Sequence, residues 1–525
     1  ATKIPELHLK NPKLWWPKGY GAPHLYDVEF CFETDGKVTD KTSFKSGVRQ
    51  MTYSEETYKP SGGMSVGSFG QSEPQRLSLF INGRRFIGFG GNWGFGESNL
   101  NYREREYDIA VAYHADMNFT MIRNWVGQIG DKEFYEACDR HGIMVWQDFW
   151  LANPVDGPNP YYTEMFNANA CDYLKRIRNH PSIGIYVGRN EGNPPAGIDD
   201  YLRGLVFREH PGLYYISNSA MGVVSGGGPY RALSPKSYFQ SYGHDKFHSE
   251  RGMPNVMNYE SMLLTFGTDK IEPVNTSETP NPVYGLHDYT LGGGKGSSAQ
   301  AASSFNDMIE KAFGRPRDAK QFAEWAQWIN YDGYRAIFEG RSEHRRGMLL
   351  WMSHSAWPSM VWQTYDYYFD PNAAYFGCKK ASEPLHIQWN PLRDDIEVVN
   401  YHAFDRTGLT ATASLFNQDG TLQWTRETKL DIKEDQTVAC FPLEQPETLS
   451  DTYFIKLSLT DSDGKQLSDN FYWRGKEDGN YKSLLQLPKV SVCKNVTVKK
   501  TGKEWLIRAV LKNEARTPAL MLRLK

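Results

Sequence analysis

The sequence lacks the cysteine spacing and the charge imbalance that mark several large classes of proteins. Its six cysteines lie far apart among 525 residues, with no C-x-x-C pair. This spacing excludes a cysteine-held metal cluster and a dense disulfide framework. Fifty-nine basic and 62 acidic residues give a formal net charge of −3, and no basic block stands out. The composition therefore gives no indication of a nucleic-acid partner.

Long apolar runs are missing as well. No stretch reaches the length that a membrane-spanning helix needs, so no membrane partner is expected. The first residues, ATKIPELHL, do not resemble a signal peptide, although such a leader is removed during maturation. The compartment stays open: we favour a secreted or periplasmic location for a bacterial protein and a vacuolar or lysosomal one for a eukaryotic protein.

What the sequence does have is an abundance of aromatic side chains, with 15 Trp and 31 Tyr. Such side chains suit stacking on flat apolar faces with a polar group nearby, and sugar rings are one such partner. They are equally typical of a β-rich protein with large interfaces. At 525 residues the chain is too long for one hydrophobic core, so three or four domains are expected.

Four regions can be distinguished along the chain. Residues 1–78 have short alternating segments typical of a β-sandwich, with a polar, Gly/Ser-rich loop or linker at 54–75. Residues 79–384 alternate short apolar strands with helical patterns. Residues 385–477 return to alternating strands and predict a second sandwich. Residues 478–525 begin a further β-unit with three or four strands, too few to close, which predicts a truncated domain.

The middle region predicts a (β/α)₈ barrel, because eight strands alternate with helical patterns along it. The stretch 251–346 is longer than one barrel helix, so we expect an insertion there. The predicted strands are FIGFGGNW (86–93), FTMIRNW (119–125), IMVWQDF (143–149), IGIYVGRNE (183–191), LYYISNSA (213–220), KSYFQSY (236–242), DKFHSE (245–250) and GMLLWMSHSAW (347–357).

Polar and aromatic residues stand at the ends of several predicted strands, where the reactive groups of a parallel barrel lie. These residues are Arg123 and Trp125 on the second strand, Asp148 on the third, Asn190 and Glu191 on the fourth, Ser249 and Glu250 on the seventh, and Trp357 on the eighth. A carboxylate at the tip of a buried strand costs free energy. Its presence on two strands therefore favours a function.

Two carboxyl groups across a barrel mouth are what glycoside hydrolysis needs. One is protonated and assists the leaving oxygen, while the other is ionised and attacks the anomeric carbon. A separation of about 5 Å leads to retention of configuration through a covalent glycosyl-enzyme. Burial and mutual repulsion keep one of the two protonated near neutral pH. Singly, each Glu is also compatible with a solvated loop and Arg123 with a structural ion pair, so the set carries the hypothesis.

Several motifs resemble glycoside hydrolase family 2. NFTMIRNW is similar to its N-x-x-x-R-x-W strand, RIRNHPSIGIYVGRNE to its R-x-x-N-H-P-S-I stretch with N-E, and FHSERGMP to its nucleophile strand. WWPKGYGAPHLYDVEF and AAYFGCKKASEPLHIQ resemble the flanking immunoglobulin-like regions. The resemblance implies a (β/α)₈ TIM barrel between immunoglobulin-like β-sandwiches, retaining β-glycosidase activity, an oligosaccharide or glycoconjugate substrate, and neither cofactor nor metal.

The resemblance also implies roles for individual residues. Glu191 would be the general acid/base and Glu250 the nucleophile. Asn190 would contact the sugar 2-hydroxyl, and Arg123 would support the nucleophile. The other residues expected to bind substrate are Trp125, Asp148, Asn92, Trp93, Tyr238, Trp351 and Trp357.

The motifs leave the sugar open between two branches of the family. The C-terminal half of the chain is most similar to exo-β-D-glucosaminidases, which act on chitosan-type oligosaccharides. N-E at 190–191, Trp125 and W-Q-D at 146–148 are more similar to β-mannosidases, and plant endo-β-mannosidases share the architecture. Asp148 is a candidate partner for the axial 2-hydroxyl of mannose or for the ammonium of glucosamine. We expect a β-mannoside.

Two features depart from the family pattern. Arg189 stands before N-E, where the family has Gly or a small polar residue. A guanidinium reaching Glu191 would lower its pKa and impair catalysis, but strand alternation indicates that Arg189 points away. The N-terminal sugar-binding sandwich of the family is missing from the sequence, so we expect a fragment of a longer or processed protein whose active site such a domain helps to wall.

Two further hypotheses compete with the glycosidase. A non-catalytic carbohydrate-binding protein on the same scaffold would keep the Trp residues and lose or misplace a carboxylate. A metal-dependent barrel enzyme would use Asp148 with His244 and His248, which lie four apart on a strand-like stretch rather than a helix.

Overall fold

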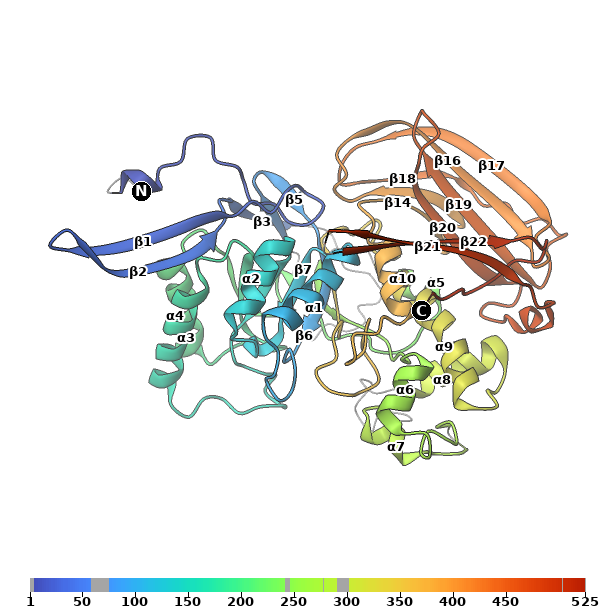
Figure 1. The fold of residues 1–525 in the computed structure, drawn as a ribbon, viewed down its shortest axis with the longest axis horizontal. Helices are drawn as coiled ribbons and strands as arrows, with labels where there is room; N and C mark the ends of the chain where they lie inside the picture. Colours follow the sequence, from blue (N-terminus) through green and yellow to red (C-terminus); the bar gives the residue numbers. More distant parts are fainter. Residues whose placement is uncertain are drawn as a thin grey trace.

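The computed structural model describes residues 4–57, 75–240, 246–276, 278–289, 302–502 and 504–524. A sheet of eight parallel strands forms the centre, with antiparallel sheets before and after it in the chain (Figure 1). The predicted fold class, a barrel flanked by β-sandwich domains, is confirmed. In the part of the chain that the structure describes, no helix has the length and apolar character needed to cross a bilayer.

The parallel strands pair in the order β10-β9-β8-β7-β6-β13-β12-β11, so β10 and β11 are the two ends of the curled sheet. Every pair is parallel, which brings the C-terminal ends of all strands to one mouth. The strands are β6 (Gly88–Trp93), β7 (Met121–Asn124), β8 (Met144–Asp148), β9 (Ile183–Arg189), β10 (Tyr215–Asn218), β11 (Val224–Ser225), β12 (Phe247–Arg251) and β13 (Gly347–Leu350).

Large side chains fill the inside of the barrel below the mouth. Met121, Met144, Trp146 and Leu349 are fully buried there around the ring of Phe247. Glycines on the two strands beside it make room: a Cβ atom added at Gly88 or Gly347 would overlap that ring. Glycine at these positions of β6 and β13 therefore leaves the space that the Phe247 ring occupies at the barrel floor.

Helices cover the outside of the barrel. Their bounds are α1 (Glu104–Asp116), α2 (Lys132–His141), α3 (Thr163–Ile177), α4 (Ala196–Glu209), α5 (Pro235–Gln240), α9 (Ala319–Glu339) and α10 (Ala373–Ala381). Between β12 and β13 the chain adds α6 (Tyr259–Phe266), α7 (Pro282–Leu286) and α8 (Ala302–Phe313) before α9. These extra helices occupy the stretch where an insertion is expected, and they form a separate lobe (Figure 1).

The structure corrects two of the predicted segments. The sixth strand is β11, of two residues. Residues 236–240 of the predicted strand 236–242 belong to helix α5 (Pro235–Gln240), and 241–242 lie outside the described residues. A two-residue strand has no periodicity to detect, so the next apolar stretch was mistaken for it. The predicted loop 54–75 begins inside strand β3 and ends at the start of strand β4; its remainder, 58–74, is not described.

The N-terminal sheets are small. The hairpin of β1 (Tyr26–Thr34) and β2 (Lys37–Ser46) extends away from the barrel (Figure 1). A second sheet joins β3 (Met51–Thr57), β4 (Gln75–Ile81) and β5 (Arg84–Phe86). Its apolar residues belong to the same core as the barrel floor, and Leu77 N donates to Val223 O at 3.0 Å. This sheet therefore closes the end of the barrel opposite the mouth.

The C-terminal sandwich packs on helix α9. One sheet holds β14 (Leu385–Asn390), β15 (Asp395–Asn400) and β18 (Gln436–Pro442); the other holds β16 (Arg406–Asn417), β17 (Leu422–Ile432), β19 (Thr452–Thr460) and β20 (Gln466–Gly475). Trp328 of α9 stacks on Trp473 of β20 at 3.9 Å, which anchors the sandwich to the barrel. A last hairpin follows, of β21 (Val492–Thr501) and β22 (Glu504–Asn513), with mostly exposed side chains.

Candidate active site

Glu250 lies near the end of β12, with 3% of its surface exposed. One carboxylate oxygen, Oε1, accepts a hydrogen bond from Arg123 Nη1 at 2.8 Å. The other, Oε2, accepts from the Tyr230 hydroxyl at 2.6 Å. A buried carboxylate held by a cation on one oxygen and a hydroxyl on the other is fixed in direction, and its ionised form is stabilised.

Arg123, on β7, is the centre of the site and is fully buried. Besides Glu250, its guanidinium donates to Asp148 Oδ2 at 2.7 Å and to Asn190 Oδ1 at 2.7 Å. The planar fork of the guanidinium therefore joins residues of four strand ends, those of β7, β8, β9 and β12. This convergence is the geometry that strand-end residues of a parallel barrel are expected to reach.

Asp148 does not face the mouth. Its side chain is fully buried, and it accepts from Arg123, from Trp146 Nε1 at 2.8 Å and from the Val126 amide at 3.0 Å. With its carboxylate oxygens occupied in this way, Asp148 orients Arg123 beneath the site. The contact between Asp148 and a sugar stays a prediction, and the structure shows these three donors around its carboxylate.

Asn190 is held from two sides. Its Oδ1 accepts from Arg123 and from Ser219 Oγ, at 2.7 and 3.3 Å. Because the oxygen faces these donors, the amide nitrogen is turned away from the guanidinium. A fixed N–H donor beside the Glu250 carboxylate is suited to recognising a sugar hydroxyl.

Glu191 follows β9 in a strained backbone conformation. Its φ of 47° lies in the left-handed region, which a non-glycine residue adopts at a free-energy cost of order 1 kcal/mol. Its amide N–H donates to Ser219 Oγ at 3.0 Å, and its Oε2 accepts from Asn153 Nδ2 at 3.4 Å. The strained turn is held by its surroundings and presents the carboxyl group at the strand tip.

The two carboxyl groups influence each other electrostatically. Burial raises the pKa of Glu250 to about 7, with Glu191 adding to the rise and Arg123 and Tyr230 opposing it. Burial also raises the pKa of Glu191 above its ordinary value. Glu250 accepts two short hydrogen bonds and Glu191 a single long one from Asn153. Burial therefore favours the protonated form of both groups, while the hydrogen bonds from Arg123 and Tyr230 oppose protonation of Glu250.

Aromatic residues flank the mouth. Trp125, after β7, packs edge-on against Trp351, after β13, with ring centroids 5.0 Å apart, and both are half-buried. Trp362 meets the Tyr230 ring edge-on at 5.9 Å. Trp357 is farther out on the same connection, 39% exposed and stacked on His287. Trp125 and Trp351 are thus placed as a wall beside the carboxylates, and Trp357 lies at the rim.

Three residues expected to bind substrate make contacts in the interior of the protein. Trp93 is fully buried, with Nε1 donating to His114 at 3.1 Å. Tyr238 is fully buried on α5, and its hydroxyl donates to the Arg231 carbonyl. Asn92 donates from Nδ2 to the backbone carbonyls of Ser249 and Leu350, so it ties β6 to β12 and β13 below the mouth. Trp93 alternates with Asn92 on β6 and therefore points outward into the helical layer.

Three neighbours of the carboxylates were missed in the sequence. Tyr230, Ser219 and Asn153 lie in loops after strands, at positions without a periodic signal. Ser219 lies near the end of the predicted fifth strand, 213–220, and directly follows β10, so its strand-end place is the available signal. Tyr230 follows the two-residue strand β11, which had itself escaped detection.

The alternative of a metal site is not favoured by the described contacts. His248 engages both ring nitrogens, with Ser225 Oγ at 2.9 Å and the Gly228 carbonyl at 2.8 Å, and His244 lies outside the described residues. Within the ranges that the structure covers, no group of three His, Cys, Asp or Glu side chains is placed to hold a metal ion.

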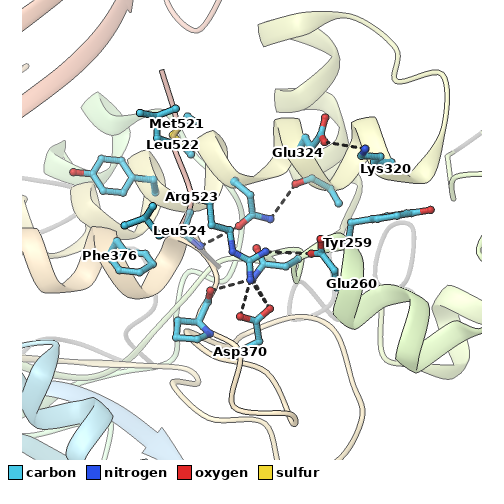
Figure 2. Close-up of a pocket in the computed structure, with 16 residues that line it drawn as sticks. Tyr259, Glu260, Lys320, Glu324, Asp370, Phe376, Met521, Leu522, Arg523 and Leu524 are labelled. Atoms are coloured by element: carbon cyan, nitrogen blue, oxygen red, sulfur yellow. Dashed lines mark hydrogen bonds and ion pairs between the residues drawn. The ribbon is translucent and has the colours of Figure 1, made fainter. Parts of the chain in front are cut away.

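A separate cavity of about 1210 Å³ lies between helices α6, α9 and α10 and the C-terminal segment 521–524 (Figure 2). Arg523 crosses it and pairs with Asp370 at 2.7 Å and with Glu260 at 3.2 Å. Neither Glu191 nor Glu250 lines this cavity. The candidate site is therefore the barrel mouth, and the cavity belongs to the inserted helices.

Known proteins share this architecture. Residues 1–49 match the sequence model of glycosyl hydrolases family 2. The chain is 29% identical to a mannosylglycoprotein endo-beta-mannosidase of Lilium longiflorum, over 92% of this chain and 54% of that protein. It is 28% identical to an exo-beta-D-glucosaminidase of Streptomyces avermitilis, over 89% and 52%. The crystal structure of the exo-chitosanase CsxA of Amycolatopsis orientalis superimposes with a TM-score of 0.80 at 23% identity, over 97% of this chain and 63% of that one.

These findings show that the chain is similar to glycosyl hydrolases of family 2 in its first 49 residues, and to named glycosidases over about nine-tenths of its length. Within that class it resembles the group named as β-mannosidases, endo-β-mannosidases and exo-β-D-glucosaminidases. The chain spans about half the length of the curated relatives it matches.

Proposed function

We propose that this protein carries the active site of a retaining β-glycosidase, with Glu250 as nucleophile and Glu191 as general acid/base. The observation that carries the proposal is the Arg123 guanidinium, which bonds to Glu250 and Asn190 at the mouth and to Asp148 beneath it, at no more than 2.8 Å. Such a cation beneath one of two neighbouring carboxyl groups separates their roles, because it favours the ionised form of that one.

The reaction proceeds in two displacements. Glu250 attacks the anomeric carbon while the bond to the leaving oxygen breaks, and Glu191 gives its proton to that oxygen. Glu191, now ionised, then takes a proton from water. The water oxygen attacks the same carbon and releases the Glu250 carboxylate. Two inversions at one carbon leave the configuration retained.

The residues around the pair assist each step. The Tyr230 hydroxyl and Arg123 hold both oxygens of Glu250, so that the carboxylate approaches in one orientation. Burial raises the pKa of Tyr230 well above its ordinary range, with the Glu250 charge adding to the rise, so the hydroxyl remains a donor. Asn190 offers its amide to the hydroxyl next to the anomeric carbon, and the Trp125–Trp351 wall takes the ring face.

A neutral sugar fits this mouth better than a cationic one. Recognition of the glucosamine ammonium needs a free carboxylate, and Asp148 was the candidate for that partner. Asp148 is instead buried against Arg123, Trp146 and Val126, and has no exposed surface. This supports a β-mannoside as the substrate, as does the likeness to the lily endo-beta-mannosidase. An exo-β-D-glucosaminidase activity is the alternative.

The test is hydrolysis of four nitrophenyl glycosides, the β-mannoside, β-glucosaminide, β-galactoside and β-glucuronide, beside the variant Glu250→Ala. We expect release of nitrophenol from the mannoside and its loss in the variant. Hydrolysis of the β-glucosaminide alone would change the proposed sugar from mannose to glucosamine and leave the proposed mechanism unchanged. Hydrolysis by Glu250→Ala at the rate of the native protein would overturn the mechanism. If none of the four substrates were hydrolysed, a mannose-terminated glycan would be tested next. Failure to hydrolyse that glycan would reject the proposed activity.

A further inference from the structure

Arg189 immediately precedes Asn190 and Glu191, yet its side chain turns away from both. It is 3% exposed. Its Nε donates to the Ala152 carbonyl at 2.7 Å, and its Nη1 donates to Asn159 Oδ1 at 2.7 Å. A longer contact of 3.5 Å joins Nη2 to the Gly157 carbonyl. All three partners belong to one loop, residues 152–159, which follows β8.

The same loop contacts the carboxyl group of Glu191. Asn153 closes a turn in which its Oδ1 accepts from the amides of Val155 and Asp156, at 2.9 and 2.8 Å. Its Nδ2 is thereby directed outward, to Asp156 and to Glu191 Oε2 at 3.4 Å. Asn153 is therefore the residue through which the loop reaches Glu191.

The ladder between β8 and β9 continues into this loop. The Phe149 amide donates to the Val187 carbonyl and the Asn190 amide to the Leu151 carbonyl, both at 2.9 Å. Beyond Leu151, hydrogen bonds from the Arg189 side chain, rather than from the backbone, connect the loop to β9. The loop also packs closely on the residue after Glu191, since a Cβ atom at Gly192 would lie 3.0 Å from Pro154.

We infer that Arg189 is a positioning residue for the general acid, because it holds the loop that places Asn153 against Glu191. This inference rests on the proposed function and adds to it the device that sets the acid in place. The loop contacts the carboxyl group of Glu191 itself, at Oε2, through Asn153. Arg189 therefore acts on departure of the aglycone rather than on attack by Glu250.

The structure predicts a specific signature for the variant Arg189→Met, which keeps an unbranched side chain and removes the donors. A good leaving group, such as dinitrophenolate, departs without a proton, whereas an alkyl or sugar alkoxide needs one. We expect kcat/KM for a substrate with a sugar aglycone to fall about 10- to 100-fold, and kcat/KM for the dinitrophenyl glycoside to fall less than about 3-fold. Arg189→Lys retains one donor, and we expect it to recover part of the loss.

A matched control exists at the other end of the same strand. Arg49 donates from Nε to the Pro181 carbonyl at 2.9 Å and from Nη2 to the Ile183 carbonyl at 2.6 Å, where β9 begins. Arg49→Met removes comparable backbone bonds far from Glu191. We expect Arg49→Met to lower kcat/KM for both substrates by the same factor, because it changes only the fraction of folded protein.

The outcomes separate the two proposals. An equal loss on both substrates in Arg189→Met, like that of Arg49→Met, would overturn the positioning role and leave the glycosidase intact. Native activity of Arg189→Met on the substrate with a sugar aglycone would also overturn the positioning role. If the native protein cleaved neither substrate while remaining folded, the proposed function would fail, and the role of Arg189 would fail with it.

Discussion

Tyr230 donates a hydrogen bond to Glu250 at 2.6 Å, on the carboxylate oxygen opposite the one that Arg123 holds. The two donors arrive from different elements, Tyr230 from the loop after β11 and Arg123 from β7. Glu250 on β12 is therefore held from two directions, by a residue that follows the neighbouring strand β11 and by one on β7. A clamp of this kind orients the carboxylate and favours its ionised form.

The variant Tyr230→Phe tests the clamp through pH. The hydroxyl stabilises the ionised form of Glu250, whose pKa of about 7 is already raised by burial. Removal of the hydroxyl raises that pKa further, so attack requires a higher pH. We expect the acidic limb of the kcat/KM profile to move up by as much as about one pH unit. A profile that drops uniformly, with its acidic limb unmoved, would argue against the assignment.

Glu191→Gln tests the acid. Gln keeps the shape of the side chain and removes the proton donor, so the loss of kcat/KM should be larger for substrates with poorer leaving groups. We expect kcat/KM for a sugar aglycone to fall about 10²- to 10⁴-fold, with little change for a dinitrophenyl glycoside. In Glu191→Ala, added azide is expected to trap the glycosyl-enzyme as a β-glycosyl azide, identified by NMR. An α-configured product would mean inversion and would reject the double displacement.

Asp148→Asn separates positioning from recognition. Because Asp148 is buried and bonded to Arg123, the change weakens the hold on the guanidinium and disturbs Glu250 and Asn190 together. We expect activity to fall about 10²-fold on every sugar that the native protein cleaves, with the preference among sugars unchanged. A changed order of preference between mannoside and glucosaminide would show instead that Asp148 contacts the sugar.

The buried nucleophile also has a consequence for stability. The folded-state pKa of Glu250, about 7, lies above the ordinary 4.5, so the folded protein binds more protons than the unfolded chain between these pH values. The contribution of this group to stability is present below pH 4.5 and is lost as the pH rises through 7. Glu250→Gln does not titrate, so we expect it to be more stable than the native protein at pH 8, by about 1–3 kcal/mol, and little changed at pH 5.

Thermal unfolding of both proteins at the two pH values measures this difference. Arg123 keeps its bonds to Asp148 and Asn190 in the variant, so the guanidinium is not left without a partner. A variant less stable than the native protein at pH 8 would show that the Arg123–Glu250 pair contributes more than the burial of the carboxylate costs.

Much of the fold and part of the site could be predicted from the sequence, for identifiable reasons. Strand-end positions follow from the alternation of strands and helices, so Glu191, Glu250, Arg123 and Asn190 were all expected at one mouth, and the structure brings them there. Asn92 and Trp93 were both expected to bind substrate. They are neighbours at the end of β6, and alternation sends neighbours on a strand to opposite sides.

Other features depend on contacts between distant segments and have no local signal. The role of Asp148 depends on Trp146 and Val126, which cover its oxygens only in the folded barrel. Tyr230 reaches Glu250 from a loop after a two-residue strand. In the sequence, Arg189 departs from the family pattern, and a guanidinium next to Glu191 would oppose protonation of that acid. The loop 152–159 binds that guanidinium and directs it away from the carboxyl group.

The ring of Phe247, seated between Gly88 and Gly347, couples three positions that are far apart in the sequence. Phe247 stands three residues before Glu250 on the same strand, so the depth at which the ring settles sets the height of the nucleophile above the barrel floor. A larger residue at either glycine would lift the strand and with it the carboxylate. During divergence these three positions are therefore free to change only together, and an alignment of relatives should show them covarying as a set.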